Sequence, residues 1–305
     1  MAAAATRAFF TRGRDRSGMF DRICVPTDGS DAAAAAFEHV LAIAADHGAT
    51  VHLLHVADTT RDSVTRIGGD VVDVLETEGE SIVEAAAARA AERGVDAETA
   101  VEQGGVPETV VDYADRIDAD LVAMSTRGRQ GVERLVGSTT ERVVRRSPVP
   151  VLALRPGDES VPYPYEDILV PTDGSPAATA ALDRAIPIAE RAGATVHVLS
   201  VVDTGGIGIG DHVEVDVLSE YADDAVAAGV ERVEAAGLEA VGAVEAASSA
   251  ARGIRSYVED PGVDLVAMGT HGRTGVGRYL LGSVAERTLR TVPVPVLTVP
   301  VPDAE

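Results

Sequence analysis

The chain has 305 residues, 46% of them hydrophobic, which is enough to bury the core of one large or two ordinary domains. Aromatic residues make up only 3%, so the core must be built from small aliphatic side chains, as is typical of parallel sheets covered by alanine-rich helices. The formal net charge is −23, and we find no basic patch to offset the resulting repulsion of phosphate backbones and anionic lipids. The composition therefore predicts an α/β protein that binds neither nucleic acid nor membrane.

The first 18 residues differ in charge from the rest of the chain, because they hold several arginines against one acid, Asp15. Their apolar stretch is too short for a secretory signal, and Met19 comes directly before the first expected strand. We expect residues 1–18 to be a disordered extension, with Met19 as an alternative start.

The single cysteine, Cys24, lies in an apolar run and has no second cysteine in the chain with which to form a disulfide. The chain also contains no run of about 18 apolar residues, the length that a membrane-spanning helix needs. We therefore expect a cytoplasmic protein.

An internal repeat divides the chain. The sequence Val-Pro-Thr-Asp-Gly-Ser begins at Val25 and again at Val170, an offset of 145 residues (170 − 25). A second marker, Pro-Val-Pro-Val-Leu, recurs at the same offset, and two distant markers with one offset predict a tandem duplication. The boundary falls in a stretch rich in proline, glycine and acid. The predicted division is a first domain over 19–155, a linker over 156–166 and a second domain over 167–301.

Each copy alternates apolar β-branched runs with alanine-rich stretches of helical period, which predicts βαβ units and a parallel sheet. Ser175 and Pro176 form an N-cap and first-turn pair, and Gly193 and Gly237 are expected to end helices. Each domain is therefore expected to be doubly wound around a five-stranded parallel sheet. In the second copy the expected strands cover residues 167–171, 195–202, 239–244, 264–268 and 294–299.

The loop after the fourth strand of the second copy carries the clearest chemical signal. It begins Gly269-Thr-His-Gly272, continues for nine residues, and ends with Gly282-Ser283 at the start of a helix. Its glycines let the backbone approach an anion, and the helix start supplies unpaired N–H groups and a positive dipole end. The loop predicts a phosphate site, against the alternative of an ordinary turn in which Ser283 is only an N-cap.

This spacing, after a strand ending in Met268 and together with the two Val-Pro-Thr-Asp-Gly-Ser segments, resembles the universal stress protein family, specifically its ATP-binding branch. The resemblance covers residues 19–301 and implies two Rossmann-like domains of the adenine nucleotide alpha hydrolase type. The acidic, lysine-free composition resembles proteins of salt-loving archaea.

In ATP-binding members of the family, the aspartate after the first strand contacts the ribose region and a valine ending the second strand presents its backbone to adenine. The glycine loop wraps the phosphates, usually with a divalent cation. The resemblance therefore implies a site for ATP, ADP or AMP, with Mg²⁺ held through the phosphates. Carried over to this chain, the site residues are Pro171, Thr172, Asp173, Val201, Met268, Gly269, Gly272, Gly282 and Ser283.

The first copy departs from this pattern. Ser125 stands where the second copy has Gly269, and only eight residues separate Gly128 from Gly137. A β-carbon at position 125 is expected to intrude where the backbone must approach phosphate, and the shorter loop wraps less of it. We therefore expect a degenerate first site, with a weak adenosine-like site left open by the residues that persist: Pro26, Thr27, Asp28 and Val56.

The leading hypothesis is a nucleotide-binding stress protein with little or no enzymatic activity. Two alternatives remain: an interaction or chaperone-like module that binds no nucleotide, and a slow ATPase. No catalytic residue is assigned, because a loop histidine beside glycines, such as His271, is more often simply exposed. No protein-held metal site is indicated, and without lysine a P-loop ATPase is excluded. The family resemblance also implies pairing through the last strand, so we expect an internal pseudo-dimer of the two domains, and two chains could associate further.

Overall fold

The computed structural model describes residues 19–58, 64–67, 70–128, 136–155, 162–205, 212–260, 262–272 and 281–301. Side chains are described over the same ranges except in 64–67, 70–74 and 212–216. The expected N-terminal extension and residues 156–161 of the expected linker lie outside these ranges.

The first domain contains a five-stranded parallel sheet in the order β7-β6-β1-β2-β5. A separate antiparallel pair, β3 (Val64–Ile67) and β4 (Asp70–Asp73), was not predicted from the sequence. The main strands are β1 (Arg22–Pro26), β2 (Thr50–Asp58), β5 (Ala97–Gly104), β6 (Leu121–Ser125) and β7 (Val151–Leu154). The helices are α1 (Asp31–His47), α2 (Val74–Glu92), α3 (Val106–Arg116) and α4 (Ser138–Arg146).

The second domain repeats this arrangement with a parallel sheet in the order β10-β9-β8-β11-β12. The predicted fold, two tandem α/β domains with doubly wound five-stranded parallel sheets, is confirmed. The strands are β8 (Asp167–Pro171), β9 (Thr195–Asp203), β10 (Ala240–Ala247), β11 (Leu265–Gly269) and β12 (Val296–Val299). The helices are α5 (Pro176–Ala192), α6 (His212–Ala235), α7 (Ala250–Glu259) and α8 (Ser283–Thr291).

The first helix of the second domain begins and ends where its sequence predicts. The hydroxyl of Ser175 accepts a hydrogen bond from the Ala178 N–H at 3.2 Å, which satisfies one of the unpaired donors of the first turn of α5. Gly193 ends the helix with φ 68°, a left-handed conformation that costs other residues more. Ser30 caps α1 in the same way, so both domains set the direction of this helix by the same local chemistry.

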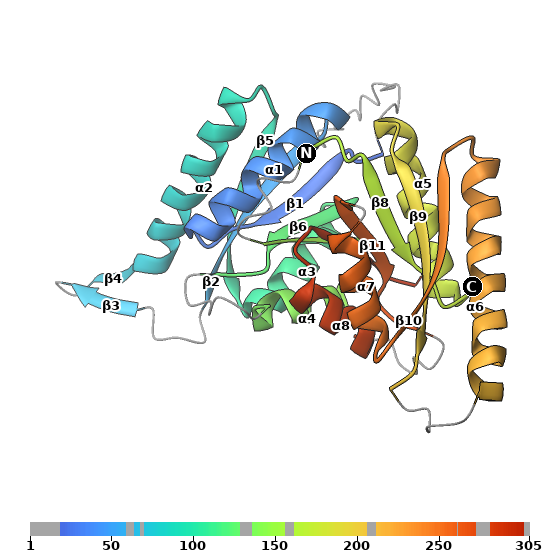
Figure 1. The fold of residues 1–305 in the computed structure, drawn as a ribbon. Coiled ribbons are helices and arrows are strands. Elements are labelled where there is room, and N and C mark those ends of the chain that lie inside the picture. The colour runs from blue at the N-terminus through green and yellow to red at the C-terminus, as the bar shows by residue number, and fades with distance from the viewer. Residues whose placement is uncertain are drawn as a thin grey trace, which may run out of the picture.

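The two sheets join into one sheet of ten strands, because β12 pairs antiparallel with β7. Figure 1 shows the first domain, in blue and green, beside the second, in yellow and red. Leu297 lies opposite Leu152 in this pairing, and the buried hydroxyl of Thr298 donates to the Val151 carbonyl oxygen at 3.1 Å. The last strands of the two copies therefore meet, and the domains form an internal pseudo-dimer.

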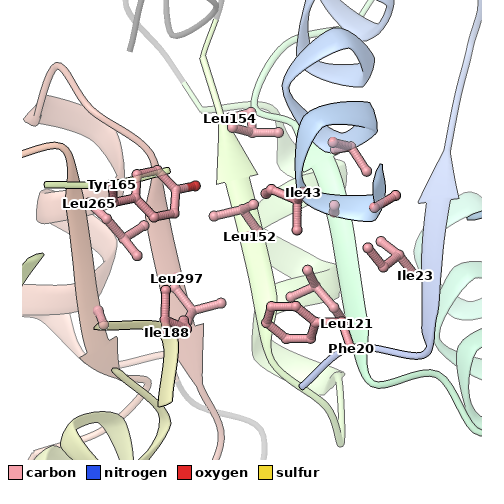
Figure 2. Close-up of a cluster of buried hydrophobic side chains, with 14 of the residues drawn as sticks. Phe20, Ile23, Ile43, Leu121, Leu152, Leu154, Tyr165, Ile188, Leu265 and Leu297 are labelled. Carbon is pink, nitrogen blue, oxygen red and sulfur yellow. The ribbon is translucent and has the colours of Figure 1, made fainter. Parts of the chain in front are cut away.

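The hydrophobic core crosses this junction. Figure 2 shows Leu152 and Leu154 of β7 between side chains of the first domain, including Ile23, and side chains of the second domain, including Leu265 and Leu297. All five are at most 3% exposed. Because burying one such side chain stabilises a fold by about 1.5–3 kcal/mol, the shared cluster holds the domains together as one body.

A polar contact spans the domains at the ends of α1 and α5. Arg191 Nε donates to Asp46 Oδ2 at 2.6 Å, and the Tyr163 hydroxyl donates to the same carboxylate oxygen at 2.9 Å. The hydrogen bond from Arg191 is the main cause that lowers the pKa of Asp46 below its usual value. Asp46 and Arg191 are 145 residues apart (191 − 46), so they occupy equivalent positions in the two copies.

Candidate functional site

A cavity of about 420 Å³ lies at the carboxyl ends of β8, β9 and β11. In the sheet, β8 stands between the other two, so the cavity opens where the winding direction reverses, the usual ligand position in doubly wound sheets. The structure brings together at this cavity every site residue predicted from the sequence: Pro171, Thr172, Asp173, Val201, Met268, Gly269, Gly272, Gly282 and Ser283.

The turn after β8 is braced by Asp173. Its Oδ1 accepts a hydrogen bond from the Ser175 N–H at 3.0 Å, and the turn passes through Gly174 with φ 73°. Its Oδ2 lies 3.0 Å from where a β-carbon on Gly272 would be, so the carboxylate also reaches the loop after β11. Asp173 therefore organises its own turn and lies against the glycine loop at the same time.

The glycine loop is closed at its base by the backbone. The Gly282 N–H donates to the Thr270 carbonyl oxygen at 2.8 Å, and a β-carbon on Gly282 would lie 3.2 Å from the same oxygen. Helix α8 starts at Ser283 with no side-chain cap, and the residues of its first turn line the cavity. The uncapped N–H groups of this turn make that end of the cavity suited to an anion. Residues 273–280 of the loop lie outside the described part of the chain.

Gly269 has a packing role that the sequence did not suggest. A β-carbon on it would lie 2.7 Å from the carbonyl oxygen of Ala177, in the first turn of α5. In the first domain the matching Ser125 is buried, and its hydroxyl accepts a hydrogen bond from the Arg127 N–H at 3.2 Å. We expected a β-carbon at this position to intrude on the phosphate. The geometry shows instead that a β-carbon on Gly269 would point toward α5.

His271 lies in the glycine loop and lines the cavity. Its Nδ1 is 2.9 Å from the Thr270 hydroxyl, and its buried Nε2 has no hydrogen-bond partner among the described residues. Within the described ranges, no three side chains of histidine, cysteine, aspartate or glutamate are grouped to hold a metal ion.

Other walls of the cavity were not predicted from the sequence. Ser200 of β9 lines it, as do Leu218 and Tyr221 on α6 and Ile254 on α7. Tyr221 is 45% exposed, and its hydroxyl oxygen lies 3.2 Å from where a β-carbon on Gly174 would be, so the ring reaches the turn after β8. The cavity is thus lined both by backbone N–H groups at the start of α8 and by apolar and aromatic side chains of α6 and α7.

Both halves of the chain, residues 19–155 and 164–300, match the universal stress protein family. The chain belongs to this family. Universal stress protein MJ0531 of Methanocaldococcus jannaschii is 32% identical over 146 residues, which cover 47% of this chain and 86% of that protein. Universal stress protein Rv2005c of Mycobacterium tuberculosis is 31% identical over 232 residues, which cover 73% of this chain and 77% of that protein.

The tandem fold has a counterpart among solved structures. A universal stress protein from Archaeoglobus fulgidus superposes with a TM-score of 0.70 at 21% identity, covering 92% of this chain and 98% of that chain. The likeness shows that the fold is shared through both domains. No helix in the described ranges of this universal stress protein is long and apolar enough to cross a membrane. Its one cysteine, Cys24, is buried, and burial raises the pKa of the thiol to about 12.

Proposed function

We propose that the second domain of this universal stress protein binds ATP, or ADP or AMP, as a stress-response or regulatory ligand. The observation that supports this most directly is one cavity, lined by all nine predicted residues, in which an uncapped helix start and apolar side chains share one space. Its volume of about 420 Å³ falls within the range of small-molecule sites, which is roughly 300–1,000 Å³.

The phosphates belong at the start of α8. The uncapped first turn offers N–H groups and about half a positive charge from the helix dipole, and Gly282 leaves room for close approach. Mg²⁺ would be carried by the phosphates, since the described residues group no metal ligands of their own. The cation would also reduce the repulsion between the nucleotide and a chain of net charge −23.

The nucleoside belongs against the walls that α6 and α7 contribute to the cavity. Tyr221 and Ile254 supply aromatic and aliphatic surface for a base, and the backbone at Val201 offers hydrogen bonds at the edge of the sheet. Asp173 also lines the cavity and supplies carboxylate oxygens that accept hydrogen bonds from ribose hydroxyl groups.

Calorimetry tests the proposal. Purified protein in molar KCl with Mg²⁺ is titrated with ATP, and we expect one ATP per chain. Thermal unfolding should show stabilisation of about 2.7 kcal/mol when free ATP is a hundred times its Kd. A wild type that gives neither heat nor stabilisation at millimolar ATP would refute the proposal. Two ATP per chain would refute the expectation that only the second domain binds the nucleotide.

The chain provides a matched pair of variants for this experiment. Gly282→Asp places a carboxylate at the phosphate end and should abolish ATP binding. Gly137→Asp is the equivalent change in the first domain (282 − 137 = 145), where a β-carbon likewise lies 3.2 Å from a carbonyl oxygen, that of Thr126. It should leave ATP binding unchanged, so equal loss in both variants would show that the effect is not local to the second site.

Slow hydrolysis of ATP is a second candidate, and His271 is the observation that favours it. Its buried Nε2, without a partner among the described residues, belongs to an imidazole that lines the cavity. Phosphate release measured for wild type and His271→Ala separates the candidates: hydrolysis that depends on His271 would make the protein an enzyme, and its absence leaves a binding protein.

A further inference from the structure

The second domain ends the ten-stranded sheet with an open strand edge. Over the described residues, β10 is the last strand of that sheet and pairs along its whole length with β9 (Figure 1). The Val196 N–H donates to the Glu239 carbonyl oxygen at 3.0 Å, and the Thr204 N–H donates to that of Ala247 at 2.8 Å. Because alternate residues of a parallel strand bond to one neighbour, the odd-numbered residues face β9 and the others point their N–H and C=O groups outward. The outward-pointing residues are Ala240, Gly242, Val244 and Ala246.

The side chains of β10 give this edge little protection. Proteins commonly place charged side chains on an open edge, which prevents another strand from pairing with it. At the other end of the sheet β5 carries two such residues, Glu98 and Glu102. Counted from the glycines that follow α2 and α6, the equivalent residues of β10 are Val241 and Glu245 (98 − 94 = 241 − 237). Val241 is 37% exposed, and no other large hydrophobic residue is exposed among the strand residues whose side chains the structure describes.

The edge of β10 is complementary to a second copy of itself. Two such strands related by a two-fold axis can pair antiparallel about Ala243, which pairs every outward N–H and C=O group of the strand. In this register Glu245 lies opposite Val241 of the other copy. The two Glu245 residues are then about 13 Å apart along the strands, four residues at about 3.3 Å each. The hydrogen-bonded pairs across the axis are Gly242 with Val244 and Ala240 with Ala246.

The first domain does not offer the same surface. The Val51 N–H donates to the Asp96 carbonyl oxygen at 2.9 Å, so the even-numbered residues of β5 face β2 just as the odd-numbered residues of β10 face β9. The equivalent two-fold register about Ala100 would place Glu102 directly opposite Glu98 of the other copy. Like charges in directly opposite positions destabilise an antiparallel pair. The two ends of the sheet therefore differ in their ability to pair with a copy.

We propose that β10 is an interaction surface through which two copies of this chain pair, antiparallel and edge to edge, about Ala243. The net charge of −23 on each chain opposes the encounter, so the pairing depends on salt that screens this repulsion. The antiparallel contact between β7 and β12 joins the domains within one chain, whereas the contact at β10 joins two chains. The inference is independent of nucleotide binding, because no residue of β10 lines the cavity.

Cysteine cross-linking tests the register. The single natural cysteine, Cys24, is buried, so an introduced cysteine supplies the accessible thiol. Ala243 would lie opposite its own copy in a non-hydrogen-bonded pair, with Cα atoms about 4.5 Å apart, a separation that a disulfide can bridge. Ala243→Cys should therefore form a disulfide-linked dimer on mild oxidation in about 2 M KCl. Ala100→Cys, the equivalent change in β5, should remain monomeric. Equal cross-linking of both variants, or none in either, overturns the proposal.

Charge changes at Val241 test the same contact without a cross-link. Val241→Arg places a guanidinium group opposite Glu245 of the other copy, and Val241→Glu places a carboxylate there. In sedimentation equilibrium the dimer Kd of Val241→Glu should exceed that of Val241→Arg at least about tenfold, because the pair occurs twice in each dimer.

Glu98→Gln is the matched control, since it changes the net charge by the same single unit as Val241→Arg but lies on β5. Its dimer Kd should equal that of wild type. A wild type that stays monomeric at about 1 mM chain, or equal Kd values for the two Val241 variants, would overturn the proposal.

Discussion

The protonation of one buried histidine should make the stability of the protein depend on pH. His39, in α1, is 5% exposed, and its Nε2 lies 2.8 Å from the Tyr165 hydroxyl. Burial lowers the pKa of His39 from 6.5 to about 4 in the folded protein. The unfolded chain therefore takes up this proton at higher pH than the folded one. The resulting stabilisation is fully present above pH 6.5 and is lost as the pH falls toward 4.

The size of the effect follows from the difference between the two pKa values. A depression of roughly 2.5 units (6.5 − 4) at 1.36 kcal/mol per unit amounts to about 3 kcal/mol in all. About 2 kcal/mol of this is lost between pH 7 and pH 5, where the unfolded histidine is charged and the folded one is neutral. The variant His39→Gln keeps a polar group within reach of Tyr165 and removes the titration, so its free energy of unfolding should fall by about 2 kcal/mol less over the same interval.

Urea unfolding at pH 7 and pH 5, in constant KCl, measures the difference between wild type and variant. Burial also lowers the pKa of His47 and of His52, but both residues are present in both proteins, so the comparison isolates His39. An NMR titration of the His39 ring gives its pKa directly. Equal losses of stability in the two proteins, or a folded pKa near 6.5, would refute the reasoning.

Three further predictions concern packing, the domain contact and charge. Gly269→Ser should destabilise the protein by about 1–3 kcal/mol in thermal unfolding, because its β-carbon meets the Ala177 carbonyl oxygen; an unchanged midpoint would contradict this. Asp46→Arg alone should lower the free energy of unfolding by about 1 kcal/mol, because both side chains of the ion pair are about one-third exposed. Adding Arg191→Asp should restore most of this free energy. Strictly additive single effects in that double-mutant cycle would show that the pair does not interact. Finally, raising KCl from about 0.1 M to about 2 M should raise the thermal midpoint by screening the net charge of −23, and a midpoint that does not rise would count against a salt-adapted surface.

Periodicity and helix-boundary residues were enough to predict the scaffold. The strands expected at 167–171 and 195–202 appear as Asp167–Pro171 and Thr195–Asp203. The expected strand 239–244 continues to Ala247, because residues 245–247 pair with 201–203 of β9. The run Glu-Ala-Ala has little strand preference of its own, so only the neighbouring strand makes it extended. The pair β3 and β4 had no signal that we recognised.

The site residues that lie in the loops after strands were predicted from the sequence, whereas those that lie within helices were missed. Topology alone places the ends of β8 and β11 together, so Asp173 and Gly282 could be assigned from sequence. Tyr221 lies in the middle of α6, and whether it reaches the cavity depends on how that helix packs on the sheet.

The contact between Asp46 and Arg191 has a consequence that depends on symmetry. In a dimer of identical one-domain chains, a residue beside the two-fold axis faces its own copy. An aspartate at such a position would face a second aspartate, and an arginine would face a second arginine. Neither pair of like charges attracts. Because the two copies are joined in one chain, the equivalent positions carry opposite charges and form an ion pair. At this contact the first domain therefore attracts the second domain, whereas two first domains or two second domains would repel each other. Pairing the same domain from two different chains would not form this ion pair.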